Sequence, residues 1–284
     1  MLKDLHRNPA PAVARSTPPQ LTDAIDSLGA ASGVANVIMQ LSWPEVGWGV
    51  RESRVDTGNV YKRPLKRART TFQYLAVATV GTDEDKRLYR EAVDRVHKLV
   101  HSTPNSRVKY SALDPRLQMW VAACLYIGFE DVFEWLHGPM TDSDREAFYA
   151  SAPTLGTTLQ VRREQWPATR AEFDDYWRDG LARVRFDAPV RRHLLGLMEL
   201  RMLPQPATLL FGRINRWITT GFLHCEFRDE LGLPWSPRDQ RRFEKFLAVT
   251  ARLNRMLPEP VRTFSYRLLL LEMRWRLRTG RPLV

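Results

Sequence analysis

Two histidines four residues apart are the first candidates for chemistry in this sequence. His97 and His101 lie in "REAVDRVHKLVH", residues 90–101, whose apolar residues recur at helical spacing. At about 100° per residue, His97 falls at the edge of the apolar stripe and His101 lies one step further toward solvent. A core-facing imidazole needs a polar partner or a ligand. His97 is therefore the better candidate for a ligand, although a hydrogen-bonded histidine at a helix interface explains the same pattern.

An acidic residue stands three positions before a histidine at two places in the chain. Asp94 precedes His97, and Glu134 precedes His137. Paired motifs of this kind on two helices, with further glutamates from two others, build carboxylate-bridged di-iron sites in helical bundles. His137 also precedes Gly-Pro at an expected helix end, where a histidine complements the helix dipole. A non-haem di-iron oxidase using these four residues is one functional hypothesis.

A dense basic turn runs directly into an apolar helix in "KRPLKRARTTFQYLAV", residues 62–77. Arg63, Arg67 and Thr71 are each four residues apart and therefore share one helix face. Arginines in a first turn oppose the helix dipole, which favours anions there. A bound carboxylate, propionate or phosphate would resolve this conflict, because a guanidinium pairs with such groups through two hydrogen bonds. A solvated basic patch is the simpler alternative.

Composition predicts a folded protein with a large core. The chain has 284 residues, a hydrophobic fraction of 44% and nine tryptophans. Its net charge of +11 raises nucleic acid, anionic lipid or an anionic ligand as partners. No nucleic acid is expected, because the basic residues stand in mixed-sign helices and no nucleic-acid-binding motif occurs. The two cysteines, Cys124 and Cys225, lie in apolar contexts and predict free thiols.

The elements that would position these residues are all helical. Apolar periodicity and capping residues predict an all-α single domain of about ten helices over residues 23–284, after a flexible, proline-rich leader over residues 1–22. The longer helices are expected over residues 64–80, 83–102, 113–137, 206–231, 237–255 and 259–278. The segment between the first two helices, residues 43–64, is expected to be a structured loop. No apolar run reaches the ~20 residues of a membrane span and no apolar signal core is present, so we expect a cytoplasmic protein. Peripheral membrane contact through basic and apolar helix faces remains open.

Several blocks of the sequence carry a family resemblance. They are "VANVIMQLSWPEVGWGVRESRVDTG", "KRARTTFQYLAVATVGTDEDKRLY", "RVHKLVHS", "YSALDPRLQMWVAACLYIGFEDVFEWLHGPMTDSDREAFY" and "WPATRAEFDDYW". Their order and spacing resemble the haem-dependent oxygenase family of rubber oxygenase (latex-clearing protein) and MpaB, over roughly residues 30–255. The resemblance implies an all-helical fold with a globin-like core that holds haem b.

The resemblance also assigns roles to individual residues. His97 matches the haem-ligating histidine, and His101 is the fallback ligand. Arg67 and Thr71 look like the family's Arg-x-x-x-Thr pattern, which implies that Arg67 positions the macrocycle or its propionates, with Arg63 in the same basic turn. Glu52 in "GVRES" is the nearest candidate for the upstream glutamate that serves as a base.

The function implied is that of a haem b-dependent oxygenase with dioxygen as co-substrate. A single axial imidazole leaves the opposite face of the iron open to dioxygen. The family's chemistry suggests oxidative C=C cleavage of a hydrophobic, unsaturated, isoprenoid-like small molecule; rubber is not the expected substrate, because the export signals of the secreted members are missing. The alternatives are the di-iron oxidase and a non-catalytic basic helical module that binds a polyanion or haem.

Overall fold

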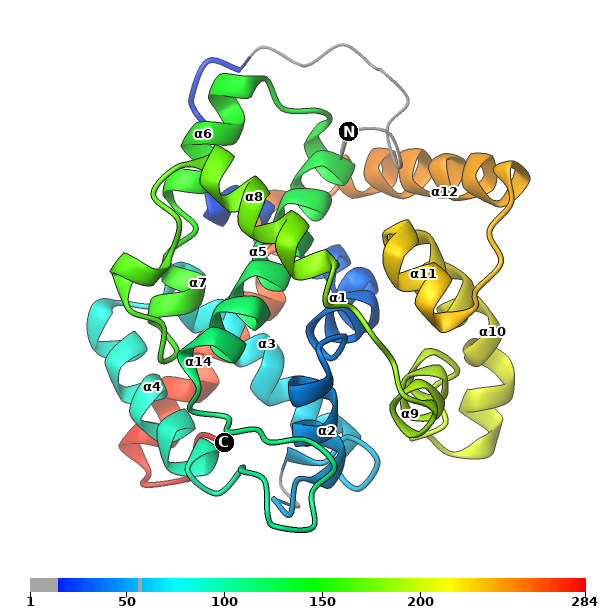
Figure 1. Ribbon diagram of the computed structural model, residues 1–284. Helices are drawn as coiled ribbons and strands as arrows, with labels where there is room; N and C mark the ends of the chain where they lie inside the picture. The colour runs from blue at the N-terminus through cyan, green and yellow to red at the C-terminus, as the bar shows by residue number, and fades with distance from the viewer. Residues whose placement is uncertain (1–14, 56–57) are drawn as a thin grey trace.

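The computed structural model describes residues 15–55 and 58–284, which fold into α-helices and short 3-10 helices joined by turns and loops (Figure 1). Within these ranges there is no β-strand, and the one extended pairing is an isolated bridge between His101 and Ser111. The prediction of an all-α single domain is confirmed. The first fourteen residues of the expected leader lie outside the described ranges, whereas Arg15 and Leu21 already pack against the helical body.

The helices follow one another in this order: η1 (Leu21–Ala24), η2 (Ser27–Ser32), α1 (Gly33–Gln40), α2 (Pro44–Glu52), α3 (Pro64–Val80), α4 (Asp83–His97), α5 (Pro115–His137), α6 (Asp142–Ala150), α7 (Thr154–Thr157), η4 (Arg163–Gln165), α8 (Arg170–Leu181), α9 (Ala188–Met198), α10 (Gln205–Phe222), α11 (Cys225–Leu231), α12 (Pro237–Arg255), α13 (Glu259–Arg262) and α14 (Phe264–Arg278).

Helix α5 is the central element of the fold (Figure 1). It begins after Asp114, whose side chain accepts a hydrogen bond from the backbone N–H of Arg116, and Pro115 occupies the first turn, where no N–H is required. It ends at Gly138, whose φ of 84° suits a residue without a Cβ. Most of its residues are buried, and it packs against η1, α1, α7 and α12. A helix that is apolar on all sides is stable only inside such a shell.

Trp120 of α5 stacks between two tryptophans from distant segments of the chain. The ring centroid of Trp120 lies 4.7 Å from that of Trp43 and 5.0 Å from that of Trp177, and the interplanar angles are 9° and 13°. The stack depends on Gly180, because a Cβ at this position would lie 2.4 Å from the Trp120 ring. The segment that precedes α2 is thereby fixed to α5 and α8.

Truncating this stack is expected to destabilise the fold strongly. Trp177 is 2% exposed, so Trp177→Ala should lower the free energy of unfolding by about 3–5 kcal/mol through lost burial and the cavity left behind. The matched control is Trp275→Ala, at a ring that is 44% exposed and should cost far less. Urea denaturation followed by circular dichroism measures both; equal losses would contradict the assigned role of the stack.

The segment 43–64 differs from its predicted loop conformation, because residues 44–52 form α2. Two glycines in this helix obscured its apolar pattern in the sequence. Gly47 is required by tertiary contact: a Cβ there would lie 2.7 Å from the backbone oxygen of Leu41. Pro44 supplies the first turn. The prediction of a loop was therefore wrong for residues 44–52. The glycines there allow close packing of a helix and do not indicate a flexible loop.

Other helix boundaries shift by a few residues or divide. The expected helix over 206–231 is two helices, α10 and α11, and the one over 259–278 is α13 followed by α14. Helix α4 ends at His97 rather than near residue 102. Helical periodicity alone does not reveal such breaks.

Candidate functional site

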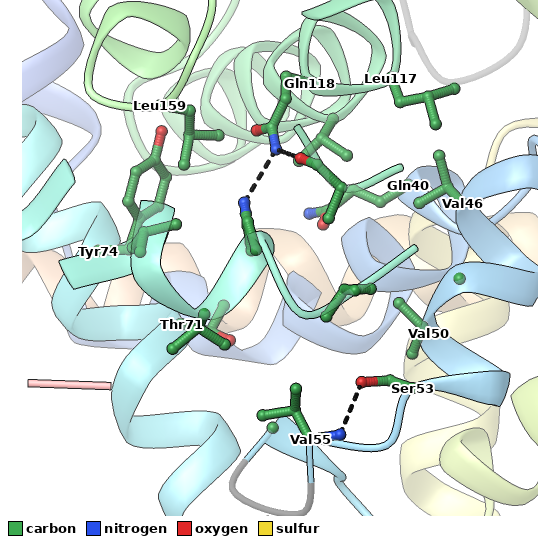
Figure 2. A pocket seen from close by; sticks show the side chains of 18 of the residues that line it. Gln40, Val46, Val50, Ser53, Val55, Thr71, Tyr74, Leu117, Gln118 and Leu159 are labelled. Atoms are coloured by element: carbon green, nitrogen blue, oxygen red, sulfur yellow. Dashed lines mark hydrogen bonds between the residues drawn. The ribbon is translucent and has the colours of Figure 1, made fainter. Parts of the chain in front are cut away.

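A cavity of about 260 Å³ lies between α2, α3, α4 and the first turns of α5. In Figure 2, Val46 and Val50 of α2 face Gln118 of α5 across it, and Thr71 and Tyr74 approach from α3. Most of the wall is aliphatic, with Val46, Val50, Val93, Val96, Val100, Leu117, Val121, Leu125 and Leu159 among the lining residues. The volume is near the lower end of small-molecule sites, which measure about 300–1,000 Å³.

His97 is part of the cavity wall, at the last residue of α4. Two side-chain amides contact its Nδ1: the Oε1 of Gln160 at 3.3 Å and the Nε2 of Gln118 at 3.1 Å. The Nε2 of Gln160 in turn donates to the carboxylate of Asp94, and the Nε2 of Gln118 donates to the backbone oxygen of Ala112. An Nδ1–H that donates to Gln160 leaves the Nε2 lone pair of His97 available for a ligand.

The electrostatic surroundings keep the His97 ring neutral. Burial lowers the pKa of His97, and the positive charge of Arg67 acts in the same direction, whereas the hydrogen bond with Gln160 raises it. A neutral imidazole is the form that binds a metal.

The lowered pKa of His97 predicts a pH dependence of stability. The unfolded chain takes up a proton near pH 6.5, but the folded protein resists protonation of this ring, so the free energy of unfolding should fall as the pH drops below about 6.5. Urea denaturation of the cofactor-free protein between about pH 5 and 7.5 measures this slope. His97→Gln should reduce the slope; an unchanged slope would contradict the lowered pKa.

Arg67 brings a positive charge to the cavity without a carboxylate to balance it. Its side chain lines the cavity and is exposed there, while desolvation by the protein atoms around the guanidinium lowers the pKa of Arg67. No ion pair joins Arg67 to an acidic residue within the described ranges. Thr71 lies one turn further along α3 on the same wall, and its hydroxyl donates to the backbone oxygen of Arg67 at 2.9 Å. The wall is therefore suited to an anionic group.

Arg63 does not line the cavity. It is the exposed residue immediately before α3, one turn before Arg67. The structure thus separates the two arginines that the sequence placed on one face.

Glu52 and His101 lie in a neighbouring hollow rather than in the main cavity. The carboxylate of Glu52 accepts hydrogen bonds from Ser106 at 2.7 Å and from Tyr110 at 3.0 Å. Tyr110, Ser53 and Val100 line both spaces, so the hollow and the cavity share a wall. His101 is exposed, and its Nδ1 lies 3.1 Å from the backbone oxygen of Ser102. Neither residue reaches the space that His97 and Arg67 share.

Among the described residues, Glu45 is the acidic side chain that lines the cavity. Its Oε1 accepts a hydrogen bond from Arg183 at 2.9 Å, while its Oε2 is buried without a hydrogen-bond partner. A buried oxygen of this kind is costly unless a ligand or water satisfies it.

The residues proposed for a di-iron site do not come together. Asp94 and His97 lie beside the first turns of α5, whereas Glu134 and His137 lie in its last turn, about 28 Å along the helix. Glu134 instead binds Arg145 at 2.9 Å. No cluster of three or more metal-ligating side chains exists in the part of the chain that the structure describes. This alternative is wrong, because the motif of Asp94 and His97 and the motif of Glu134 and His137 lie near opposite ends of α5.

Sequence reasoning missed three polar groups of the site. Gln118 could have been noticed as a buried amide in the apolar run "LQMWVAACLYIG". Gln160 and Glu45 carry no such signal, because they reach the site from a loop and from a helix that the sequence did not predict.

Comparison with known proteins identifies the family. A family model described as the catalytic domain of the ER-bound oxygenase mpaB/B' and rubber oxygenase matches residues 24–253. The chain belongs to this family. It is also 52% identical over 250 residues to an uncharacterized protein of Mycobacterium bovis, Mb2261, and equally to one of Mycobacterium tuberculosis, Rv2237, in each case covering 88% of this chain and 98% of the relative. No solved structure matches.

Membership of this family confirms the resemblance that the sequence blocks indicated. It also supports an oxygenase activity for this protein. Every helix in the described ranges is too short or too polar to span a bilayer.

Proposed function

We propose that this protein is a haem b-dependent oxygenase that acts on a hydrophobic, unsaturated small molecule. The observation that carries the proposal is the position of His97: its ring lines an apolar cavity, and in the tautomer whose Nδ1–H donates to Gln160, Nε2 is free to bind an iron. Arg67 supplies the cation that a haem propionate requires. The donor set therefore fits a b-type haem.

Each wall of the cavity has a separate task in this proposal. Haem held by His97 and Arg67 would supply the activation of dioxygen. The valines of α2 and α4 exclude water and contact an apolar substrate. The described volume of about 260 Å³ is too small for haem and substrate together, so we expect the surrounding helices to move apart on loading.

We further propose that the substrate is isoprenoid-like and is cleaved at a C=C bond with dioxygen as co-substrate, in the cytoplasm. Glu45 is the side chain best placed to hold or accept a proton at a reacting carbon, through its unpartnered Oε2. Glu52 keeps the role of candidate base only if it moves into the main cavity, because its carboxylate accepts hydrogen bonds from Ser106 and Tyr110 in the neighbouring hollow.

Replacing Arg67 and replacing Arg63 should have different effects on haem affinity. Arg67→Gln should weaken haem binding by about 10- to 100-fold, the equivalent of a charge-assisted hydrogen bond. Arg63→Gln should have little effect, because Arg63 is exposed outside the cavity. Titration of the cofactor-free variants with haemin measures both affinities. Equal losses would show that both arginines hold the cofactor, as the sequence alone suggested.

The function itself is tested by turnover. The purified protein, reconstituted with haemin, is incubated with squalene or β-carotene under ¹⁸O-labelled dioxygen, and the products are analysed by mass spectrometry. Labelled carbonyl or hydroxyl products support the oxygenase. Stable haem binding without dioxygen-dependent products from either substrate would favour the non-catalytic haem-binding module.

A further inference from the structure

The last three helices combine exposed apolar side chains with a strong positive charge. Residues 237–284 contain twelve Arg or Lys and four Asp or Glu residues, a net charge of +8 out of +11 for the whole chain. The exposed apolar residues of this segment, from the last turn of α12 through α13 and α14, form what we call the C-terminal ridge: Leu253, Met256, Leu257, Val261, Phe264, Leu268, Leu271 and Trp275.

The exposed apolar face of α14 is separate from the face that this helix buries in the core. On α14, Phe264, Leu268, Leu271 and Trp275 recur at helical spacing and are 44–61% exposed. The opposite face of the same helix is buried through Tyr266, Leu270 and Met273, and α14 packs against α3. Helix α14 is therefore apolar on two sides, one packed and one facing solvent. Singly exposed apolar residues need no explanation, but a stripe along a helix does.

Cationic side chains border the ridge. Arg267 and Arg278 lie on the exposed side of α14, and Arg252 lies on that of α12. Arg267 makes a long ion pair with Glu259 at 3.5 Å, which is exposed and contributes little. Within the described ranges, neither Arg252 nor Arg278 pairs with a carboxylate. An apolar stripe flanked by arginine and including a tryptophan is typical of helices that lie in a membrane interface.

We propose that the C-terminal ridge docks this protein on the surface of an anionic lipid bilayer. The apolar side chains would enter the interface, and the bordering arginines would contact lipid phosphates. A second copy of the chain is a poorer occupant, because a two-fold symmetric contact through this ridge would bring like charges together.

The ridge also leads toward the cavity. Beyond α14, the backbone oxygen of Leu283 accepts a hydrogen bond from Arg69 of α3 at 3.2 Å, and Val284 lines the cavity. Docking by α14 would therefore hold the cavity near the bilayer, where a hydrophobic substrate resides. This last link rests on the proposed function, whereas binding to lipid does not.

Vesicle co-sedimentation of the purified full-length protein tests the proposal. We expect binding to phosphatidylcholine vesicles that contain about 30% phosphatidylglycerol, little binding to pure phosphatidylcholine, and weaker binding in about 1 M salt, where the Debye length is short. Leu268→Glu combined with Leu271→Glu should reduce binding by about tenfold or more. Arg252→Gln combined with Arg278→Gln keeps the apolar ridge and should reduce binding about fivefold per arginine.

The matched control changes equally exposed leucines outside the ridge. Leu209 and Leu210 on α10 are 80% and 65% exposed, and Leu209→Glu with Leu210→Glu should leave vesicle binding unchanged. Circular dichroism checks that each variant is folded. The proposal would be overturned if the ridge variant and the arginine variant both bound vesicles as well as the wild type does. It would also be overturned if the α10 control lost as much vesicle binding as the ridge variant. A dimer that dissociates in the ridge variant, without vesicle binding by the wild type, would assign the ridge to self-association.

Discussion

Replacing His97 with alanine is expected to remove haem from this protein. Among the described residues that line the cavity, His97 is the only imidazole. The cavity tyrosines are poor substitutes as ligands, because burial raises the pKa of Tyr74 and Tyr89 and disfavours the phenolate. The variant should therefore lose the Soret band and the bound iron that we expect of the wild type.

Ultraviolet-visible spectra with iron quantification measure this loss, and His101→Ala is the matched control. His101 lies one turn beyond His97 in sequence but is exposed outside the cavity, so its replacement should leave the spectrum unchanged. Added imidazole should restore part of the Soret band of His97→Ala by occupying the space of the missing ring. A full Soret band in His97→Ala, or its loss in His101→Ala, would refute the assignment of the ligand. Iron without a Soret band would indicate non-haem iron.

The two amides at His97 should have opposite effects on haem binding. Gln160→Leu removes the acceptor for Nδ1–H, so Gln118 can donate to Nδ1 and the proton moves to Nε2, where it blocks an iron. We expect about a 10- to 100-fold loss of haem affinity, as for other groups that orient metal-ligating histidines. Gln118→Leu removes the competing donor, so affinity should stay the same or rise.

Titration of the cofactor-free variants with haemin measures these affinities, and the reduction potential gives a second readout. Losing the Gln160 acceptor makes the imidazole a weaker donor to iron, so the potential of Gln160→Leu should become more positive. Asp94→Asn should shift both quantities in the same direction by less, since Asp94 acts through Gln160. Gln118 also binds the backbone oxygen of Ala112, so circular dichroism must show that its variant is folded. Equal losses in both variants would mean that packing alone orients the ring.

The local patterns of the sequence were sufficient for the helical fold and for part of the site. Capping residues and apolar periodicity located α3, α5 and α12 to within about two residues, since each of these signals depends on neighbours in the chain. The same periodicity placed His97 at the edge of a buried face, where the structure has it. The order and spacing of the motif blocks were sufficient to indicate the oxygenase family.

The tertiary structure alone decided which polar groups share the cavity. Spacing put Arg63 and Arg67 on one face, yet only Arg67 reaches the cavity, because α3 begins immediately after Arg63. Gln160 and Glu45 contact the site from segments more than 50 residues away from His97, and no local rule links residues at such separations. The sequence therefore determined the helices and the candidate ligand, whereas long-range packing selected the partners that orient this ligand and balance its charge.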